Sequence, residues 1–382
     1  MSSSSPAPMP LPQADGVAVT LVAGAHAVDV SAVAAAVRGP RADLLHSGQL
    51  ELVEGGEAVV DARRLDPRRR ARVDAHLVAD AVAEHVASLL DDGRRRGVVV
   101  EVPVTADARS VALLTGRLLE DVVAEHEPGH AVEHATERTA GTAGLRHVVS
   151  VVRAGELADL VLGRRDESFL EAERVADLVE HATVVVLTGL AGLPGGEGDL
   201  VVELVHRLAP VARVLDAGVV LSGASLPEQG DVPGLASAAG WMRELSGAGG
   251  LPLVGATVRT WTFRDPRPFH TERLARAVDV DLVPERVGRV LRSKGFVHLA
   301  TRPDRIGGWS SVGALLSLDP SVLRAFEADA PLGQELVFYG TDLRVDVLEE
   351  VLASCLLTPA ELLAGPERWR TGADPFPRWP GE

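Results

Sequence analysis

The chain has 382 residues, of which 46% are hydrophobic and only 3% aromatic, so it can form two domains with cores of Val, Leu and Ala. Its net charge of −16 argues against a free duplex-binding protein, because such a protein needs a basic face for the phosphates. One cysteine, Cys355, excludes a disulfide within the chain and favours a reducing compartment.

The ends and the hydropathy of the chain bear on its location. Residues 1–16, MSSSSPAPMPLPQADG, lack the basic and apolar regions of a secretory signal, and their composition predicts a disordered tail. No apolar run reaches the roughly 18 residues that a membrane span needs. We therefore expect a cytoplasmic protein with neither a membrane nor a nucleic acid as its partner.

Residues 17–235 alternate short Val-rich runs with longer stretches of helical periodicity. The predicted strands are Val17–Val22, Gly97–Val102, Arg146–Val152 and Thr183–Thr188. The predicted helices are Val30–Val37, Ala71–Leu90, Ser110–Leu119, Glu171–Glu180 and Leu200–Leu208. Continuous apolar strands that alternate with helices are typical of βαβ units around a parallel sheet. The pattern predicts an α/β domain.

The composition and the hydrophobic periodicity of the sequence change in its second half. Residues 236–255 belong to a stretch rich in Gly, Ser, Ala and Pro and predict a linker. Residues 256–365 predict a smaller α+β domain, with strands in ATVRTWTFR, GRVLRSKGFVHLATR and ELVFYGTDL and an amphipathic helix in RVDVLEEVLASCLL. Cys355 lies on the apolar face of that helix, which predicts a buried thiol. Residues 366–382 predict a Pro-rich, extended tail.

The stretch LVAGAHAVDVSAVAAAV, residues 21–37, lies where nucleotide-binding α/β domains carry the phosphate-binding loop G-x-x-x-x-G-K-[ST]. Gly24 takes the first Gly position and Ser31 the hydroxyl position. Asp29 replaces the second Gly and Val30 replaces the Lys, so a carboxylate stands near the phosphate seat and no ammonium neutralises the phosphates. The alternative is that Asp29 and Ser31 only cap a helix.

Four sequence blocks follow one another in the second half: PFH-x-x-RL, R-x-KG-F, W-S-x-x-G and Q-E-L-V-F-x-G. As an ordered set they resemble the C-terminal domain of the CobW family. The resemblance implies a P-loop GTPase of the SIMIBI class that acts as a zinc or cobalt metallochaperone. The first half corresponds to the GTPase domain of that family by position and length.

The resemblance also implies site residues, which we compare one motif at a time. The C-x-C-C metal motif should fall in residues 50–64, which contain no Cys, and Glu57 is the most similar polar group there. The switch Glu corresponds to Glu101. In the N-K-x-D motif, Thr188 takes the Asn place and Ala191 the Asp place, so the acceptor for the guanine edge is missing.

Joint loss of the phosphate, metal and guanine motifs predicts a CobW-like protein of metal homeostasis with a degenerate GTPase domain. GTP and Mg²⁺ are then not expected as cofactors, zinc or cobalt is left open, and the partner would be a client metalloprotein or a paralogous GTPase. Two alternatives remain open. One is an active GTP-dependent metallochaperone with a divergent loop, and the other is a structural partner of an intact paralogous GTPase.

The segment EHEPGHAVEHATE contains a second candidate metal site. Its imidazole and carboxylate groups have ligand chemistry suited to zinc or cobalt. Pro128 and Gly129 disfavour one continuous helix, so a solvated loop is the alternative. The candidate ligands are His126, His130, Glu133 and His134.

The C-terminal domain also suggests a contact surface. We expect His270 to make a domain contact, and one face of the sheet to meet the first domain or a partner near Trp261, Lys294, His298 and Trp309. The alternative is that the two Trp fill the core of a small domain.

Overall fold

The structure is a computed structural model that describes residues 16–38, 42–47, 73–94, 96–126, 143–164, 169–226, 238–249 and 256–379. It divides into two compact units, Met1–Val149 with Leu221–Gln229 and Ser150–Val220 with Gly230–Glu382. The division falls inside a strand of the α/β sheet, whereas the sequence places a linker at residues 236–255. Part of that stretch is a helix, α10 (Gly240–Leu245), with Trp241 buried.

A six-stranded sheet with the order β2-β3-β1-β4-β5-β6 forms the first layer of the fold. Strands β2 and β3, β3 and β1, and β5 and β6 pair in parallel. The strands are β1 (Val17–Gly24), β2 (Ala42–Leu45), β3 (Gly97–Glu101), β4 (Ala143–Arg153), β5 (Val184–Thr188) and β6 (Arg213–Asp216). The α/β architecture with a mostly parallel sheet and flanking helices, expected from the sequence, is confirmed.

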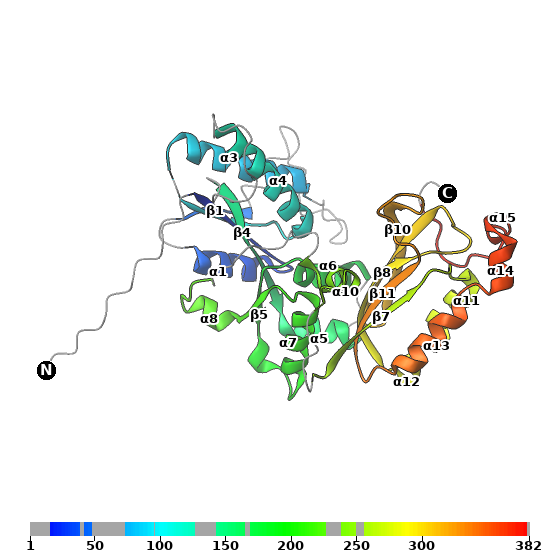
Figure 1. The fold of residues 1–382 in the computed structure, drawn as a ribbon. Coiled ribbons are helices and arrows are strands. Elements are labelled where there is room, and N and C mark those ends of the chain that lie inside the picture. The colour runs from blue at the N-terminus through cyan, green and yellow to red at the C-terminus, as the bar shows by residue number, and fades with distance from the viewer. Residues whose placement is uncertain are drawn as a thin grey trace, which may run out of the picture. The chain divides into compact units, whose positions relative to one another are not determined.

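Helices follow the strands, as the alternation predicts. In the first unit, Figure 1 shows α3 and α4 on one side of β1 and α1 on the other. Buried Val78, Val82 and Val86 recur every four residues along α3, which gives this helix one apolar face. The helices and turns that alternate with the strands of this sheet are α1 (Ala27–Val37), α3 (Ala75–Asp91), α4 (Ala108–His126), α5 (Ala154–Val161), α6 (Phe169–Glu180), η2 (Leu190–Gly192), α7 (Glu197–Leu208) and α8 (Ala217–Leu221).

Two strands of this sheet were not predicted from the sequence. Strands β2 and β6 have only four residues each and lie at the two edges of the sheet. An edge strand needs no apolar run on both faces, so neither has the Val-rich signature by which β1, β3, β4 and β5 were recognised.

A second, antiparallel sheet has the order β10-β9-β8-β11-β7. The predicted strands near residues 256–264, 288–302 and 335–343 are three of its members, and β9 and β10 form a hairpin at one edge. The strands are β7 (Val258–Asp265), β8 (Arg289–Val297), β9 (Arg305–Val312), β10 (Leu315–Arg324) and β11 (Gln334–Thr341).

One face of this sheet packs on α13, the helix that the amphipathic pattern predicts. Leu348 and Leu352 of α13 join Leu336 and Phe338 of β11 in one apolar core, and Cys355 is buried at 1% exposure. In Figure 1, α11 and α13 lie on one side of the sheet and α6 and α10 on the other. The remaining helices are α11 (Thr271–Arg276), a π-helical turn η3 (Ala277–Asp281), α12 (Pro284–Val287), α13 (Val345–Cys355), α14 (Pro359–Ala364) and α15 (Pro366–Trp369).

The backbone geometry explains why the R-x-KG-F block has a glycine. Gly295 has a φ of +152°, and a Cβ at this position would collide with the carbonyl oxygen of Glu335 on the neighbouring strand. Only Gly allows β8 and β11 to approach this closely.

The C-terminal segment, which the sequence predicts as a Pro-rich tail, packs on the antiparallel sheet through Trp379. Trp379 is 3% exposed, and its Nε1 donates to the carbonyl oxygen of Leu318 at 3.0 Å. Arg302 stacks over the Trp379 ring at 4.3 Å and donates to Asp374 at 2.8 Å. An aromatic ring and a guanidinium therefore hold this segment, and neither produces a periodic signal in a Pro-rich sequence.

Candidate functional site

The turn between β1 and α1 does not have the form of a phosphate-binding loop. It consists of Ala25 and His26, because α1 already begins at Ala27. The backbone N–H groups of Asp29 and Val30 both donate to the carbonyl oxygen of His26 at 3.1 Å. A phosphate loop needs such groups free to point at the anion. Here they are part of the first turn of the helix.

The helix-cap alternative is also not what the structure has. The N-cap of α1 is His26, without a side-chain cap hydrogen bond, so Asp29 and Ser31 lie inside the helix. Asp29 is in the first turn, where a negative charge interacts favourably with the helix dipole.

Glu101, the expected switch Glu, is the centre of a small polar cluster at the end of β3. Its Oε2 accepts a hydrogen bond from Ser31 Oγ at 3.2 Å, and its Oε1 lies 3.1 Å from His46 Nδ1. The Glu101 side chain is only 4% exposed, whereas that of His46 is 58% exposed. The structure thus brings two predicted residues together with His46, which sequence reasoning missed because it follows a short edge strand.

The expected guanine-reading segment lies at the end of β5. Thr188 is the last residue of the strand, Gly189 has a φ of +72°, and Ala191 is exposed in the turn η2. The methyl group of Ala191 offers no acceptor to a base edge.

The His-rich candidate can be placed only in part. His126 ends α4, where its Nδ1 lies 2.7 Å from the carbonyl oxygen of Val122 and its Nε2 lies 3.1 Å from Asp91 of α3. The hydrogen bond to Val122 raises the pKa of His126. His130, Glu133 and His134 lie outside the described residues, and so does Glu57.

The residues expected on one contact surface occupy different positions. Trp309 is 3% exposed in the core beneath α13, and Trp261 packs against the same core, so both Trp lie on the face opposite Lys294. Alternation along the strands explains this, since Trp309 is paired with Gly295, next to Lys294 in β8. His298 contacts the Pro331 carbonyl oxygen at 2.9 Å, and the His270 N–H donates to the Cys355 carbonyl oxygen at 2.7 Å.

Lys294 instead faces α6, where it enters a network of charged side chains. Its Nζ lies 3.1 Å from Glu173, 2.8 Å from Asp177 and 3.0 Å from Glu180. Arg292, which is 1% exposed, donates from Nε to Glu180 Oε1 at 2.7 Å and from its other nitrogens to Glu173 and Ser310. No sequence pattern predicted this network, because the carboxylates of α6 lie more than 100 residues away from Arg292 and Lys294.

The charges of this network control its protonation. Burial raises the pKa of Glu180, but the positive charges of Arg292 and Lys294 outweigh burial and bring it to about 2. The pKa of Glu173 is lowered for the same reason. Burial, reinforced by the two other carboxylates, raises the pKa of Asp177. Burial lowers the pKa of Lys294, and the carboxylates reverse this and raise it.

Comparison with known families identifies the second part of the chain. Residues 258–356 match the family described as the cobalamin synthesis protein cobW C-terminal domain. These residues form a CobW C-terminal domain. The resemblance to the CobW family, expected from the four ordered sequence blocks, is confirmed.

One curated relative and two solved structures are similar beyond this domain. The zinc-regulated GTPase metalloprotein activator 1 of Dictyostelium discoideum is 29% identical over 242 residues, which are 58% of this chain and 48% of the relative. The chain thus spans about half the length of that relative. Zn(II)-bound YjiA GTPase from E. coli and a Zn(II)-bound triple mutant of it are each 16% identical, with 90% of this chain and 99% of theirs covered. Their TM-score of 0.31 supports no inference.

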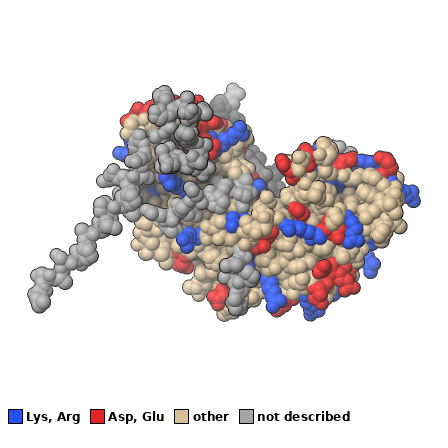
Figure 2. All heavy atoms as spheres, in the orientation of Figure 1, with Lys and Arg blue, Asp and Glu red and all other residues tan. Residues whose placement is uncertain are grey.

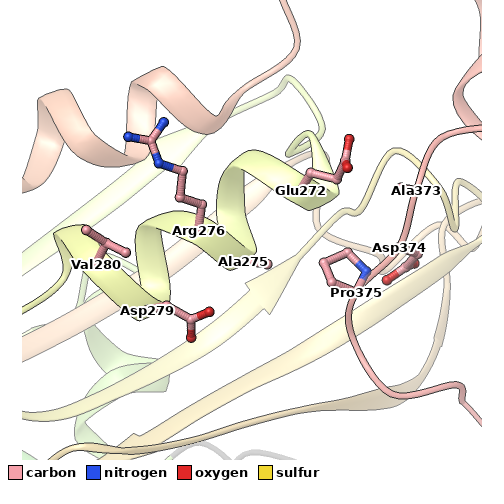
Figure 3. Close-up of a pocket in the computed structure, with 8 residues that line it drawn as sticks. All are labelled: Glu272, Ala275, Arg276, Asp279, Val280, Ala373, Asp374 and Pro375. Carbon is pink, nitrogen blue, oxygen red and sulfur yellow. The ribbon is translucent and has the colours of Figure 1, made fainter.

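An open cavity of about 460 Å³ lies beside α11 of the CobW C-terminal domain (Figure 3). Figure 3 shows Glu272, Arg276 and Asp279 pointing in different directions around the helix. Asp374 already accepts hydrogen bonds from Thr301 and Arg302. The lining residues therefore present no convergent set of groups. They are Glu272, Ala275, Arg276, Asp279, Val280, Ala373, Asp374 and Pro375.

Charged side chains of both signs occur on the described surface that Figure 2 shows. Acidic and basic side chains are interspersed over the described part of the face in Figure 2. Within the described ranges, no helix combines the length and the apolar character needed to cross a bilayer.

Proposed function

We propose that this chain handles zinc or cobalt in the manner of a CobW-type metallochaperone, and that it does so without binding or hydrolysing GTP. The observation that carries the proposal is the early start of α1, which ties the N–H groups of Asp29 and Val30 to His26. The family match of residues 258–356 and the name of the curated relative support the metal-related part. A client metalloprotein is the corresponding partner.

The side chains at the start of α1 are not suited to bind a nucleoside triphosphate with Mg²⁺. Val30 supplies no ammonium, and the carboxylate of Asp29 would face the phosphates. Two like charges about 4 Å apart repel each other by roughly 4 kcal/mol at an effective dielectric constant near 20. Because binding free energies of micromolar ligands are about −8 kcal/mol, such a term removes much of the affinity.

The Glu101 cluster does fit a borderline metal ion as cargo. Carboxylate oxygen and imidazole nitrogen are accepted ligands of Zn²⁺ and Co²⁺, and Glu101 and His46 present both at one place. The hydrogen bond from Ser31 orients the carboxylate, as outer groups commonly do at metal sites. The exposed ring of His46 gives the ion access from solvent. With a single, buried cysteine, a site of three thiolates is impossible.

Calorimetry with GTP and Mg²⁺ tests the first half of the proposal. We expect no heat that fits a micromolar Kd, because neither the N–H groups nor a lysine is in place to hold the phosphates. A GTP-hydrolysing CobW protein in the same buffer serves as the positive control. Micromolar binding at unit stoichiometry would refute this half and would favour an active GTPase with a divergent loop.

Competition with a chromophoric chelator tests the second half. We expect His46→Ala and Glu101→Gln each to weaken Co²⁺ and Zn²⁺ binding at this site by at least about tenfold, because each removes a ligand. His76→Ala, an exposed imidazole in the same unit, is the matched control and should have no effect. Unchanged affinity in both test variants would remove the site and leave the role of a structural partner as the better explanation.

A further inference from the structure

The side chain of Lys294 occupies a position that is already built to hold a cation. Its ammonium group lies within 3.1 Å of carboxylate oxygens from Glu173, Asp177 and Glu180, all on α6. The three carboxylates carry three negative charges, and Lys294 and Arg292 neutralise two of them. If a divalent ion replaced the Lys294 ammonium, the ion and Arg292 together would neutralise all three.

The end of α6 also carries the ligand types of a metal site. Asp177, Glu180 and His181 have spacing i, i+3 and i+4, which places them on one face, and the helical pattern continues from the Asp177 carbonyl to the His181 N–H. One ligand atom from each of the three lies within 4.8 Å of the others. Two oxygens and one imidazole nitrogen form a donor set suited to Zn²⁺ or Co²⁺.

A buried hydroxyl on β11, the strand next to β8, is a second, independent observation. Tyr339 is 1% exposed and is paired with Arg292 in the sheet, on the face that meets α6. Its hydroxyl has no hydrogen-bond partner among the described residues. Burial raises the pKa of this phenol, and the negative charges of Glu180 and Glu244 raise it further. This buried hydroxyl is therefore a polar atom on the same face as Arg292 and Lys294 that a water molecule accompanying a bound ion could satisfy.

We propose that Asp177, Glu180 and His181 form a divalent-metal site that Lys294 occupies when no metal is bound. The ion displaces the ammonium group, which then moves to solvent, while the three ligands stay on one helix. This site stands independently of the Glu101 cluster and of any nucleotide. Metal binding at this site would therefore break the ion pairs that Lys294 of β8 makes with α6.

Lys294 rather than Arg292 is the group that can leave. Arg292 is 1% exposed and donates to Glu173, Glu180, Ser310 and the Ser311 carbonyl oxygen. Lys294 is 14% exposed at the end of a flexible chain, and Asp177 beside it is 37% exposed. An incoming ion therefore reaches the carboxylates along the path by which the ammonium departs.

The test uses the full-length chain with His46→Ala and Glu101→Gln, so that the proposed Glu101 site contributes nothing. Co²⁺ alone is the probe, followed by its visible absorption bands and by competition with a chelator. In this background we expect unit stoichiometry. His181→Asn should weaken binding by at least about tenfold, and His206→Asn, an exposed imidazole on α7, should not. Lys294→Met should tighten binding by about tenfold, because it removes the competitor and one repelling charge.

The ring of Trp241, 5.9 Å from Lys294 Nζ, supplies a second readout. Loss of this cation–π contact should change the fluorescence on Zn²⁺ addition, and the change should be absent in Trp241→Phe. If Lys294→Met does not fold, Asp177→Asn tests the ligand set at a partly exposed position. Absence of Co²⁺ binding in the background, or equal effects of His181→Asn and His206→Asn, would overturn the proposal. So would unaltered affinity in a folded Lys294→Met.

Discussion

Replacement of Arg292 by Ala is expected to lower the free energy of unfolding by about 3–5 kcal/mol, the range found when one partner of a buried ion pair is removed. Arg292 is 1% exposed and donates to Glu180, whose side chain is also 1% exposed. Without the guanidinium, the Glu180 carboxylate stays buried and loses one of its two hydrogen-bonded cations, while Ser310 and the Ser311 carbonyl lose a donor.

Urea denaturation followed by circular dichroism measures this effect. Arg289→Ala, at an exposed position on the same strand, is the control and should remain within about 0.5 kcal/mol of the parent chain. A loss of less than about 1 kcal/mol in Arg292→Ala would mean that the network contributes little to stability.

The same network predicts an acid dependence with a definite sign. The pKa of Glu180 is about 2 in the folded chain, below its ordinary value of 4.5. Its contribution to stability is therefore complete above the unfolded pKa and is lost as the pH falls toward 2. Glu173 acts in the same direction, whereas the raised pKa of Asp177 acts against it. In Arg292→Ala the stability should fall less steeply over this acid range.

Replacement of Trp309 by Ala is expected to destabilise the CobW C-terminal domain by about 3–5 kcal/mol, because it empties a large volume in a closed core. The ring packs in the cluster with Phe338 and Leu336. Its Nε1 donates to Ser293 Oγ at 2.8 Å, so the substitution also leaves a buried hydroxyl with one partner fewer.

Thermal and urea unfolding of the full chain provide the measurement. Phe326→Ala removes an aromatic ring that is 80% exposed and should have little effect on stability. If Trp309→Ala left stability unchanged and only weakened binding to a partner, Trp309 would belong to a docking surface, and its place in the core would be in question.

The candidate sites show which features of function a linear pattern can carry. The sequence alone shows that Val30 stands where a phosphate-binding Lys is expected and Ala191 where a guanine-binding Asp is expected. Both expected residues act through their side chains, so their loss is visible without a structure. Whether the N–H groups near Asp29 are free is a different question, since it depends on where α1 begins. The hydrogen bonds of the first helical turn determine whether these N–H groups are free. A run of small apolar residues does not indicate at which residue the helix begins.

The sequence by itself determined the main architecture and the relation to the CobW family. Buried parallel strands require continuous apolar runs, so β1, β3, β4 and β5 were recognisable in the sequence. The four ordered blocks lie within residues 258–356, which match the CobW C-terminal domain. These signals are local, because each depends on neighbouring residues of one element.

Only the tertiary structure decided how distant elements meet. The pairing of Lys294 with Glu173, Asp177 and Glu180 joins residues 114 to 121 positions apart, and no periodicity encodes such a separation. The side of the sheet that Trp309 faces depended on the register of β8 and β9, because a shift of one residue exchanges the two faces. The meeting of Ser31, His46 and Glu101 likewise required three elements to be placed side by side, which only packing achieves.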